Sequence, residues 1–273
     1  MIAPLDKMQT SDGTEIAYRL RGESKGRSRI VLVHSLAMDH SFWDPVADLL
    51  SEKASVLTFD CRGHGASDKP PGPYTVELFA RDLADLMSHV GWPSAIVAGA
   101  SMGGCVSLAF AAAYPERTEG LGLFDTTAWY GPEAPQQWAE RADRALVAGL
   151  KDLVDFQITR WFGDRFRQEH PEVVQQCVDV FLASNVKAYA ETCRMLGACD
   201  VRAARPRLRT PVRIAVGEED YATPVKMAED LHAGLAGSSL TILPKARHLT
   251  PLEVPQKIAA ELEALLAERS RAA

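Results

Sequence analysis

The stretch Val97-Ala98-Gly99-Ala100-Ser101-Met102-Gly103-Gly104 is a short apolar run that ends in a Gly-x-Ser-x-Gly pattern. This pattern is typical of a nucleophile elbow, in which a serine occupies a strained turn between a strand and a helix. Small residues on both sides of the serine allow the strand and the helix to approach closely. The flanking sequence fits, because 94–98 reads as a buried strand and 105–114 as a helix that stops before Pro115. We therefore expect Ser101 to be a nucleophile; the alternative is a glycine-rich helix start with an idle serine.

Composition favours a globular protein without a nucleic-acid partner. The chain has 273 residues, 24% of them charged and 47% hydrophobic, and a formal net charge of −6. This balance argues against disorder and leaves no general basic field for nucleic acid. The start lacks a basic segment followed by an apolar one, and no apolar run reaches the length of a membrane span. We expect a cytoplasmic protein with no membrane partner.

The number and spacing of the cysteines also favour a cytoplasmic location. The five cysteines are odd in number and lack C-x-x-C spacing, as expected for reduced thiols in a cytosol. Cys105 follows the nucleophile closely but is interpreted as a small buried hydrophobe, and it receives no role.

Strand and helix patterns alternate along most of the chain. A hairpin is expected around Asp12-Gly13, and continuous apolar strands at 30–35, 55–60, 94–98, 119–125, 212–216 and 239–243. Helical periodicity marks 42–52, 76–90, 105–114, 224–235 and 255–269. We therefore expect an α/β fold with a mostly parallel twisted sheet covered by helices on both faces.

The segment from 126 to 205 departs from this rhythm. It shows no strand, and helices are expected at 136–146, 150–162, 172–183 and 186–196. A helical insertion between two strands of one sheet is the expected form of a lid. The predicted domains are thus a core of 1–125 and 206–273, interrupted by a helical lid of 126–205.

A serine nucleophile needs a base, and the base needs an orienting acid. His248 follows the strand at 239–243, and Asp220 follows the strand at 212–216. Ser101, Asp220 and His248 are therefore the predicted catalytic residues, in an order known for such triads. Glu218 and Glu219 are alternatives for the acid.

Asp125 is a further candidate acid, because it ends the strand after the elbow. A carboxylate there can also reach the histidine; otherwise it would cap a turn. The sequence leaves open whether Asp125 can substitute for Asp220.

The reaction also requires donors for the oxyanion. The backbone N–H groups of Met102, directly after the nucleophile, and of Leu36, in the loop after the strand at 30–35, are the predicted pair. Two further histidines, His34 and His64, are interpreted as structural residues that brace these loops.

Substrate contacts are expected from the lid, where aromatic residues concentrate. Trp138 and Trp161 are candidates, although lid core is the favoured interpretation for any one of these aromatic residues. Arg160 could hold a substrate carboxylate bidentately, or it could be an exposed arginine. No metal-ligand spacing or phosphate-binding glycine pattern is present, so no cofactor is expected.

The chain resembles the α/β-hydrolase superfamily over nearly its whole length and, within it, the 3-oxoadipate enol-lactonases. The matching stretches are Ser35-Leu36 through Pro45, Asp60 through Ser67 with 71–75, Ser101-Met102-Gly103-Gly104, Arg160-Trp161-Phe162 with Phe166-Arg167, 171–174 and 189–193. The resemblance implies hydrolysis of a cyclic enol ester through Ser101, Asp220 and His248. His34, Asp125-Thr126-Thr127 and Ala198-Cys199-Asp200 depart from the usual pattern, which affects the specific lactone and not the triad.

We thus expect a hydrolase of carboxylic esters or lactones with a small, acidic substrate. The alternatives are a hydrolase of carbon–carbon bonds in vinylogous diketones and a non-catalytic ligand receptor on the same scaffold. Dehalogenase chemistry is disfavoured, because such enzymes of this fold need a carboxylate at the elbow. The sequence does not predict the oligomeric state.

Overall fold

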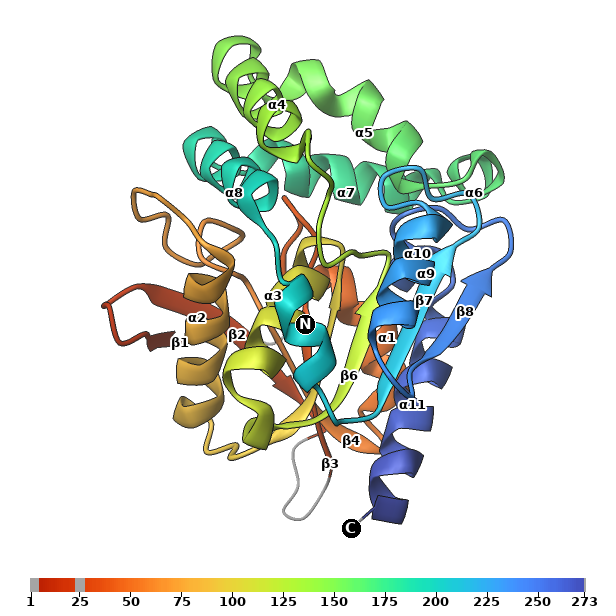
Figure 1. Ribbon diagram of the computed structural model, residues 1–273. Coiled ribbons are helices and arrows are strands. Elements are labelled where there is room, and N and C mark those ends of the chain that lie inside the picture. Colours follow the sequence, from red (N-terminus) through yellow and green to blue (C-terminus); the bar gives the residue numbers. More distant parts are fainter. Residues whose placement is uncertain (1–4, 23–27, 273) are drawn as a thin grey trace.

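A computed structural model of the chain describes residues 5–22 and 28–272 (Figure 1). Residues 1–4, part of the start for which no targeting signal is expected, lie outside the described residues.

The described residues form an eight-stranded sheet with the order β1-β2-β4-β3-β5-β6-β7-β8. Its strands are β1 (Asp6–Gln9), β2 (Glu15–Arg21), β3 (Ser28–Val33), β4 (Ala54–Phe59), β5 (Ala95–Ala100), β6 (Thr118–Phe124), β7 (Val212–Gly217) and β8 (Ser239–Leu243). The β1–β2 hairpin and the β2–β4 pair are antiparallel, and every other pair is parallel. The chain places β4 on one side of β3 and β5 on the other, so the loops after β3 and β5 meet where the strand order reverses.

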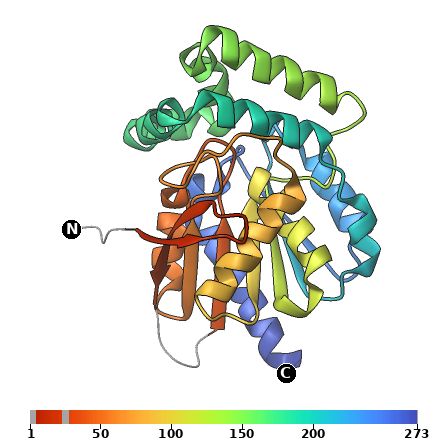
Figure 2. The same cartoon turned by 90° about the vertical axis from the view of Figure 1, so that its left-hand side faces the viewer.

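Helices cover both faces of this sheet, which confirms the predicted fold class (Figure 2). α2 (Val76–His89) packs against α3 (Met102–Ala113), and α1 (Asp44–Leu50) packs against α11 (Pro255–Ala272). α9 (Val225–Gly234) packs on β7 and β8, and α10 (Thr250–Glu253) precedes α11. The helix expected at 42–52 is divided into a 3₁₀ turn (His40–Trp43) and α1, because Pro45 cannot donate a hydrogen bond within a continuous helix.

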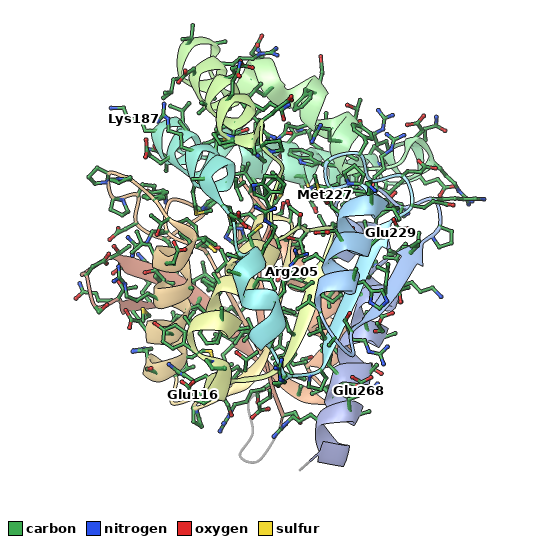
Figure 3. All side chains as sticks on the ribbon, in the orientation of Figure 1. Glu116, Lys187, Arg205, Met227, Glu229 and Glu268 are labelled. Carbon is green, nitrogen blue, oxygen red and sulfur yellow. The ribbon has the colours of Figure 1, made fainter. Side chains whose placement is uncertain are left out.

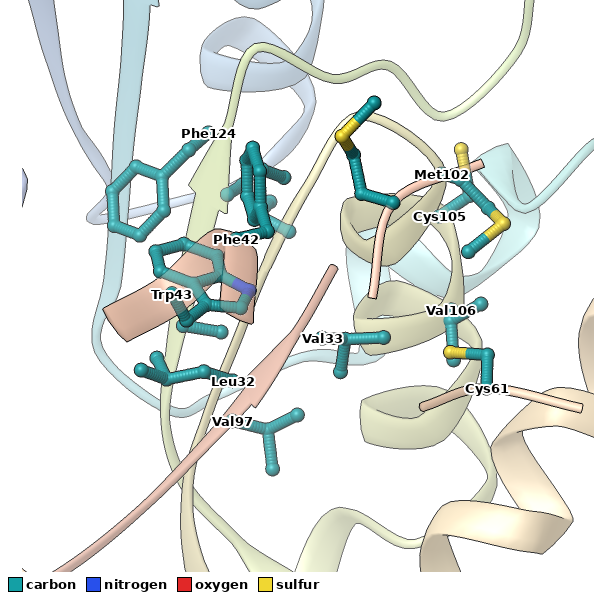
Figure 4. Packing of buried hydrophobic residues seen from close by; sticks show 14 of the residues in the cluster. Leu32, Val33, Phe42, Trp43, Cys61, Val97, Met102, Cys105, Val106 and Phe124 are labelled. Atoms are coloured by element: carbon teal, nitrogen blue, oxygen red, sulfur yellow. The ribbon is translucent and has the colours of Figure 1, made fainter. Parts of the chain in front are cut away.

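The core around the elbow is packed from strands, helices and one aromatic cluster (Figure 4). Trp43 is fully buried and meets Phe124 edge-on, with the ring centroids 6.2 Å apart. Met102 and Val97, on either side of the elbow, are also fully buried. Burying side chains of this size contributes about 1.5–3 kcal/mol each, so the strained turn rests on a well-packed base.

Between β6 and β7 the chain leaves the sheet and forms helices that lie beyond the carboxyl ends of the strands (Figure 1). They are α4 (Ala134–Ala148), α5 (Val154–Trp161), α6 (Asp164–Glu169), α7 (Pro171–Ala183) and α8 (Val186–Ala198), with 3₁₀ turns at Leu150–Leu153 and Arg202–Arg207. The α4 and α8 helices pack against each other. An antiparallel bridge between Trp129 and Asp200 joins the two chain segments that enter and leave this region.

The structure divides this region more finely than the periodicity indicates. The helix expected at 150–162 is a 3₁₀ turn followed by α5, and α6 was not expected. Phe162 has extended backbone between α5 and α6, and α6 spans only six residues. A helix this short shows fewer than two turns of periodicity, which is too little for a pattern to indicate.

All five cysteines are buried and unpaired. Cys105 is fully buried, and its thiol donates to the carbonyl oxygen of Thr127 at 3.3 Å. Within the described part of the chain, no helix is both long and apolar enough to cross a membrane.

Candidate active site

Ser101 lies between β5 and α3 in a backbone conformation that non-glycine residues rarely adopt, with φ of 53°. Close approach around it explains the glycines. A Cβ on Gly99 would lie 2.1 Å from the carbonyl oxygen of Gly103, and a Cβ on Gly103 would lie 2.1 Å from that of Val33. Because the strand and helix backbones nearly touch, only glycine fits at these two positions, and the turn projects Ser101 above the sheet.

His248 lies within hydrogen-bond reach of Ser101. It occupies the loop between β8 and α10, and its Nε2 lies 2.9 Å from Ser101 Oγ. On the other side of the ring, Nδ1 lies 2.8 Å from Asp220 Oδ2. With Nδ1 donating to the carboxylate, Nε2 is left to accept the serine proton.

Asp220 is held in place by the turn that follows it. Its Oδ1 accepts from the N–H groups of Ala222 and Thr223 at 2.7 and 2.9 Å, and its Oδ2 accepts from the Thr223 hydroxyl at 2.8 Å. Burial opposes ionisation, yet the adjacent His248 and the Thr223 donors hold the pKa of Asp220 below its ordinary value. Asp220 is therefore a carboxylate aimed at the imidazole.

The alternative acids are engaged elsewhere. Glu218 accepts from the backbone N–H of Lys245 at 3.0 Å, and Glu219 faces Arg247 at 3.5 Å. Asp125 accepts from the backbone N–H of Gly217 at 3.0 Å and from the Thr250 hydroxyl at 2.5 Å. Asp125 thus joins the end of β7 to the start of α10 and supports the two loops that carry Asp220 and His248.

The predicted oxyanion donors lie beside the nucleophile. Leu36 lines the same cavity as Ser101 and His248, and Met102 is the first residue of α3. The N-terminus of a helix favours a developing negative charge. His34 supports this arrangement, since its Nε2 accepts from the N–H of Cys61 at 2.9 Å and its Nδ1 donates to the carbonyl of Ser35 at 2.7 Å.

The cavity above Ser101 is small. It measures about 30 Å³, which gives room for about two water molecules. An outer groove of about 570 Å³ adjoins it. Met227, labelled in Figure 3, lines this groove where α9 approaches the inserted helices. Tyr130, Trp138, Arg141 and Arg160 line both spaces and so form the neck between them.

Two arginines at this neck lack a carboxylate partner among the described residues. Within residues 5–22 and 28–272, no carboxylate oxygen lies within 4.0 Å of the Arg141 or Arg160 guanidinium. Arg141 donates from Nε to the Tyr189 hydroxyl at 2.7 Å and lies over the Trp138 ring, 4.9 Å from its centroid. Arg160 lies over Phe156, also at 4.9 Å. Burial and the nearby Arg141 charge lower the pKa of Arg160, as expected for a cation without a counterion.

The structure places every predicted site residue at or beside this cavity. Trp138, Arg160 and Trp161 line it, and Trp161 also packs edge-on against Phe181, so it serves the interior of the inserted region as well. Sequence reasoning missed Arg141 and Thr223. Arg141 lies three residues after Trp138, and this spacing on a helix could have placed both side chains on one face. Thr223 gave no signal of its own.

Among the described residues, one group has a possible metal-ligand arrangement: Asp39, His40 and Asp60. Its donor atoms already have protein partners. Asp60 Oδ1 accepts from the backbone N–H and from Nδ1 of His40, and its Oδ2 accepts from the N–H of Ala66. These contacts brace the loops after β3 and β4.

Comparison with known proteins adds independent information. A family model described as the α/β hydrolase fold matches residues 28–255. The 3-oxoadipate enol-lactonase 2 of Acinetobacter baylyi is 31% identical over 257 residues, covering 94% of this chain and 95% of that protein. The crystal structure of an enol-lactonase from Burkholderia xenovorans superposes with a TM-score of 0.91 at 32% identity, covering 96% of this chain and 100% of the other. A thermophilic esterase from Thermogutta terrifontis, with malate bound, gives a TM-score of 0.90 at 28% identity, covering 98% and 99%.

Proposed function

The chain belongs to the α/β-hydrolase fold family and is a carboxylic ester hydrolase, and from this premise we propose that it opens a small carboxylate-bearing lactone or ester through Ser101, His248 and Asp220. The observation that carries the proposal is the continuous hydrogen-bonded series from Ser101 Oγ through His248 to Asp220. It lies beneath two arginines that have no carboxylate partner within the described residues.

In the proposed reaction Ser101 Oγ attacks the carbonyl carbon while His248 Nε2 takes the serine proton. The negative charge that develops on the carbonyl oxygen is held by the N–H groups of Leu36 and Met102. His248 then gives its proton to the departing oxygen, leaving the acyl group on Ser101. Water, deprotonated by His248, attacks the acyl carbon. The bond between the acyl carbon and Ser101 Oγ then breaks, His248 returns the proton to Ser101 Oγ, and the acid leaves. Asp220 keeps the imidazole in the required tautomer and stabilises the imidazolium.

The neck residues define the proposed substrate class. Arg141 and Arg160 are half-buried. A half-buried guanidinium without a counterion binds a carboxylate, and two of them at one neck favour an anionic substrate. The small cavity over Ser101 suits the compact ester group, and the carboxylate would lie at Arg141 and Arg160. The enol-lactonase relatives are consistent with this class.

The same proposal includes a division of the chain into a core and a lid, and a location in the cell. Residues 126–205 would act as the lid over a core of 1–125 and 206–273. Trp138, Arg160 and Trp161 from this lid would contact the substrate. We also propose a cytoplasmic location, which the five unpaired cysteines support.

A kinetic comparison tests the proposal. We would measure kcat/KM for freshly generated 3-oxoadipate enol-lactone and for an uncharged short-chain nitrophenyl ester, with Ser101→Ala as the blank. We expect Ser101→Ala to remove turnover of both compounds without changing Tm, and the lactone to exceed the ester by at least about 100-fold. Turnover by Ser101→Ala would overturn the mechanism. A preference for the uncharged ester would leave the mechanism and overturn the substrate class.

A further inference from the structure

The loop that carries His248 is bonded to one corner of the inserted helical region, the α5–α6 corner (residues 159–164). The backbone N–H groups of His248 and Leu249 both donate to the carbonyl oxygen of Trp161, at 3.1 and 3.0 Å. The Trp161 side chain is 3% exposed. The backbone position of the histidine is therefore set by a residue outside the sheet and its covering helices.

Arg247, directly before the histidine, reaches the same corner. Its Nη1 donates to the carbonyl oxygens of Thr159 and Phe162 at 2.9 and 3.1 Å. Its Nη2 lies 3.0 Å from an oxygen of Asp164. The last carbonyls of a helix have no partner within the helix, and a cation there satisfies them and complements the helix dipole. Arg247 thus caps the carboxyl end of α5.

Glu253, the last residue of α10, closes the connection from the other side. Its Oε1 accepts from the N–H of Gly163 at 3.0 Å, and its Oε2 accepts from the N–H of Arg247 at 2.8 Å. A Cβ on Gly163 would lie 2.9 Å from Glu253 Oε1, so the glycine permits this close approach. Both carboxylate oxygens are used, one on each side of the junction.

We propose that Arg247 and Glu253 are positioning residues, which hold His248 in register with Ser101 and Asp220 by fastening its loop to the α5–α6 corner. The inference rests on the proposed function of the triad. The two ring contacts of His248 measure 2.8 and 2.9 Å, and a shift of its backbone changes both together. A misplacement of about 1 Å in such a site costs up to about 100-fold in rate.

The connection also limits how the lid can move. If the whole lid lifted from the sheet as one body, it would withdraw the acceptor of the His248 N–H and displace the base. Arg160 neighbours Trp161 in the chain, so the element that presents a cation to the substrate is the one that holds the histidine. Opening is then confined to parts of the lid away from this corner, such as α4, whose Trp138 and Arg141 line the outer groove.

Two variants test the proposal: Glu253→Gln and Arg247→Met. A glutamine offers one acceptor oxygen where the carboxylate offers two, and a methionine offers no donor. The assay uses an uncharged nitrophenyl ester, so that Arg141 and Arg160 do not enter. We expect each variant to lose about 10- to 100-fold in kcat, with KM within about twofold of the wild type. Labelling of Ser101 by a fluorophosphonate should slow in parallel.

Arg247→Lys and Arg213→Gln are the matched controls. A lysine can donate to one of the two carbonyls, so Arg247→Lys should recover part of the lost kcat. Arg213 is an ion-paired arginine at a distance from the site, 3.2 Å from Glu261 and also paired with Glu268, and Arg213→Gln should keep the wild-type kcat. If Glu253→Gln does not fold, the Arg247 pair carries the test.

The outcomes are distinct. Wild-type kcat in folded Glu253→Gln and Arg247→Met would overturn the positioning role and leave the triad untouched. A lower Tm with unchanged kcat would overturn it equally, since that is the result of a purely structural contact. Failure of the proposed function itself would appear instead as turnover by Ser101→Ala.

Discussion

The carboxyl ends of the strands and the inserted helices contribute to the site by different means. Ser101, Asp220 and His248 follow β5, β7 and β8, and backbone contacts determine their places. Examples are the close approach at Gly103 and the N–H donors around Asp220. The helical region contributes Trp138, Arg141 and Arg160, which reach the cavity with long side chains from α4 and α5.

This difference separates reaction type from substrate choice. Few substitutions are tolerated where backbone contacts fix the catalytic residues, so the reaction type stays the same. Long side chains on helices can be exchanged with little effect on the fold, so the neck can change its preferred substrate while the triad stays the same. Arg247 and Glu253 are the proposed exception, because they couple the two regions.

The largest expected effect on kcat belongs to a residue at the carboxyl end of a strand, Asp220. Asp220→Asn should lower kcat by about 10⁴-fold on both charged and uncharged esters, because an asparagine favours the wrong tautomer of the histidine. Asp125→Asn, the matched change, should lower kcat far less, since Asp125 bonds to Gly217 and Thr250 and not to His248. Steady-state kinetics of both variants checks this. Equal losses would mean that the two aspartates share the orienting role.

The pH dependence of stability should also arise in the core. Burial, together with the nearby His34, lowers the pKa of His64 to about 3, and burial lowers that of His34 to about 4. In the unfolded chain both histidines have a pKa of 6.5. On acidification the unfolded chain therefore binds protons at these two side chains at a pH where the folded chain does not. The contribution of these neutral histidines to the free energy of unfolding is fully present above pH 6.5. It is lost as the pH falls from 6.5 toward the folded pKa values of about 4 and 3.

Between pH 7 and pH 5 this loss should reach about 2 kcal/mol for each histidine. Urea unfolding at the two pH values measures it. His64→Gln removes one of the two groups and should reduce the difference between the two pH values, even if it lowers stability at both. An unchanged difference would show that His64 is not a source of the pH dependence.

In the inserted helices, Arg141→Met should affect selectivity. We expect kcat/KM for a carboxylate-bearing ester to fall by about 10- to 100-fold, with the uncharged ester changed by less than about threefold, because a charge-assisted contact of about 1.5–3 kcal/mol is lost. Parallel kinetics on the two esters provides the measurement. Equal losses on both would mean that Arg141 supports the packing of the inserted helices and does not bind the substrate.

The smallest effect should come from Arg144, one turn further along the same helix. Its guanidinium pairs with Asp152 at 2.7 Å, and both side chains are about half exposed. Exposed pairs contribute about 0–1 kcal/mol, so Arg144→Gln should leave Tm and kcat/KM nearly unchanged on either ester. A loss as large as that of Arg141→Met would indicate that the whole basic face of α4 attracts the substrate by long-range charge.

The sequence predicts the sheet and its covering helices far better than the inserted helices, for physical reasons. The elbow can be predicted because its apolar strand, its glycines and its helix are contiguous in residues 94–114. The fold class follows from the alternation of strand and helix patterns along most of the chain. Asp220 and His248 can be predicted because each follows a strand end. The roles of Arg141, Arg247 and Glu253 depend on how distant helices meet, which no local period indicates. The six-residue α6 helix is too short for a pattern to reveal.

The order in which the site is assembled along the chain has a consequence for its synthesis. The nucleophile precedes the inserted helices, whereas the acid, the base and Glu253 all follow them. A growing chain therefore presents Ser101 long before His248 has been made, and β7 and β8 must still join the sheet. Chains are extended at about 5–20 residues per second, so this interval lasts about 7–30 seconds. During it the serine has no base, and any product truncated before residue 248 would carry the nucleophile yet remain inert.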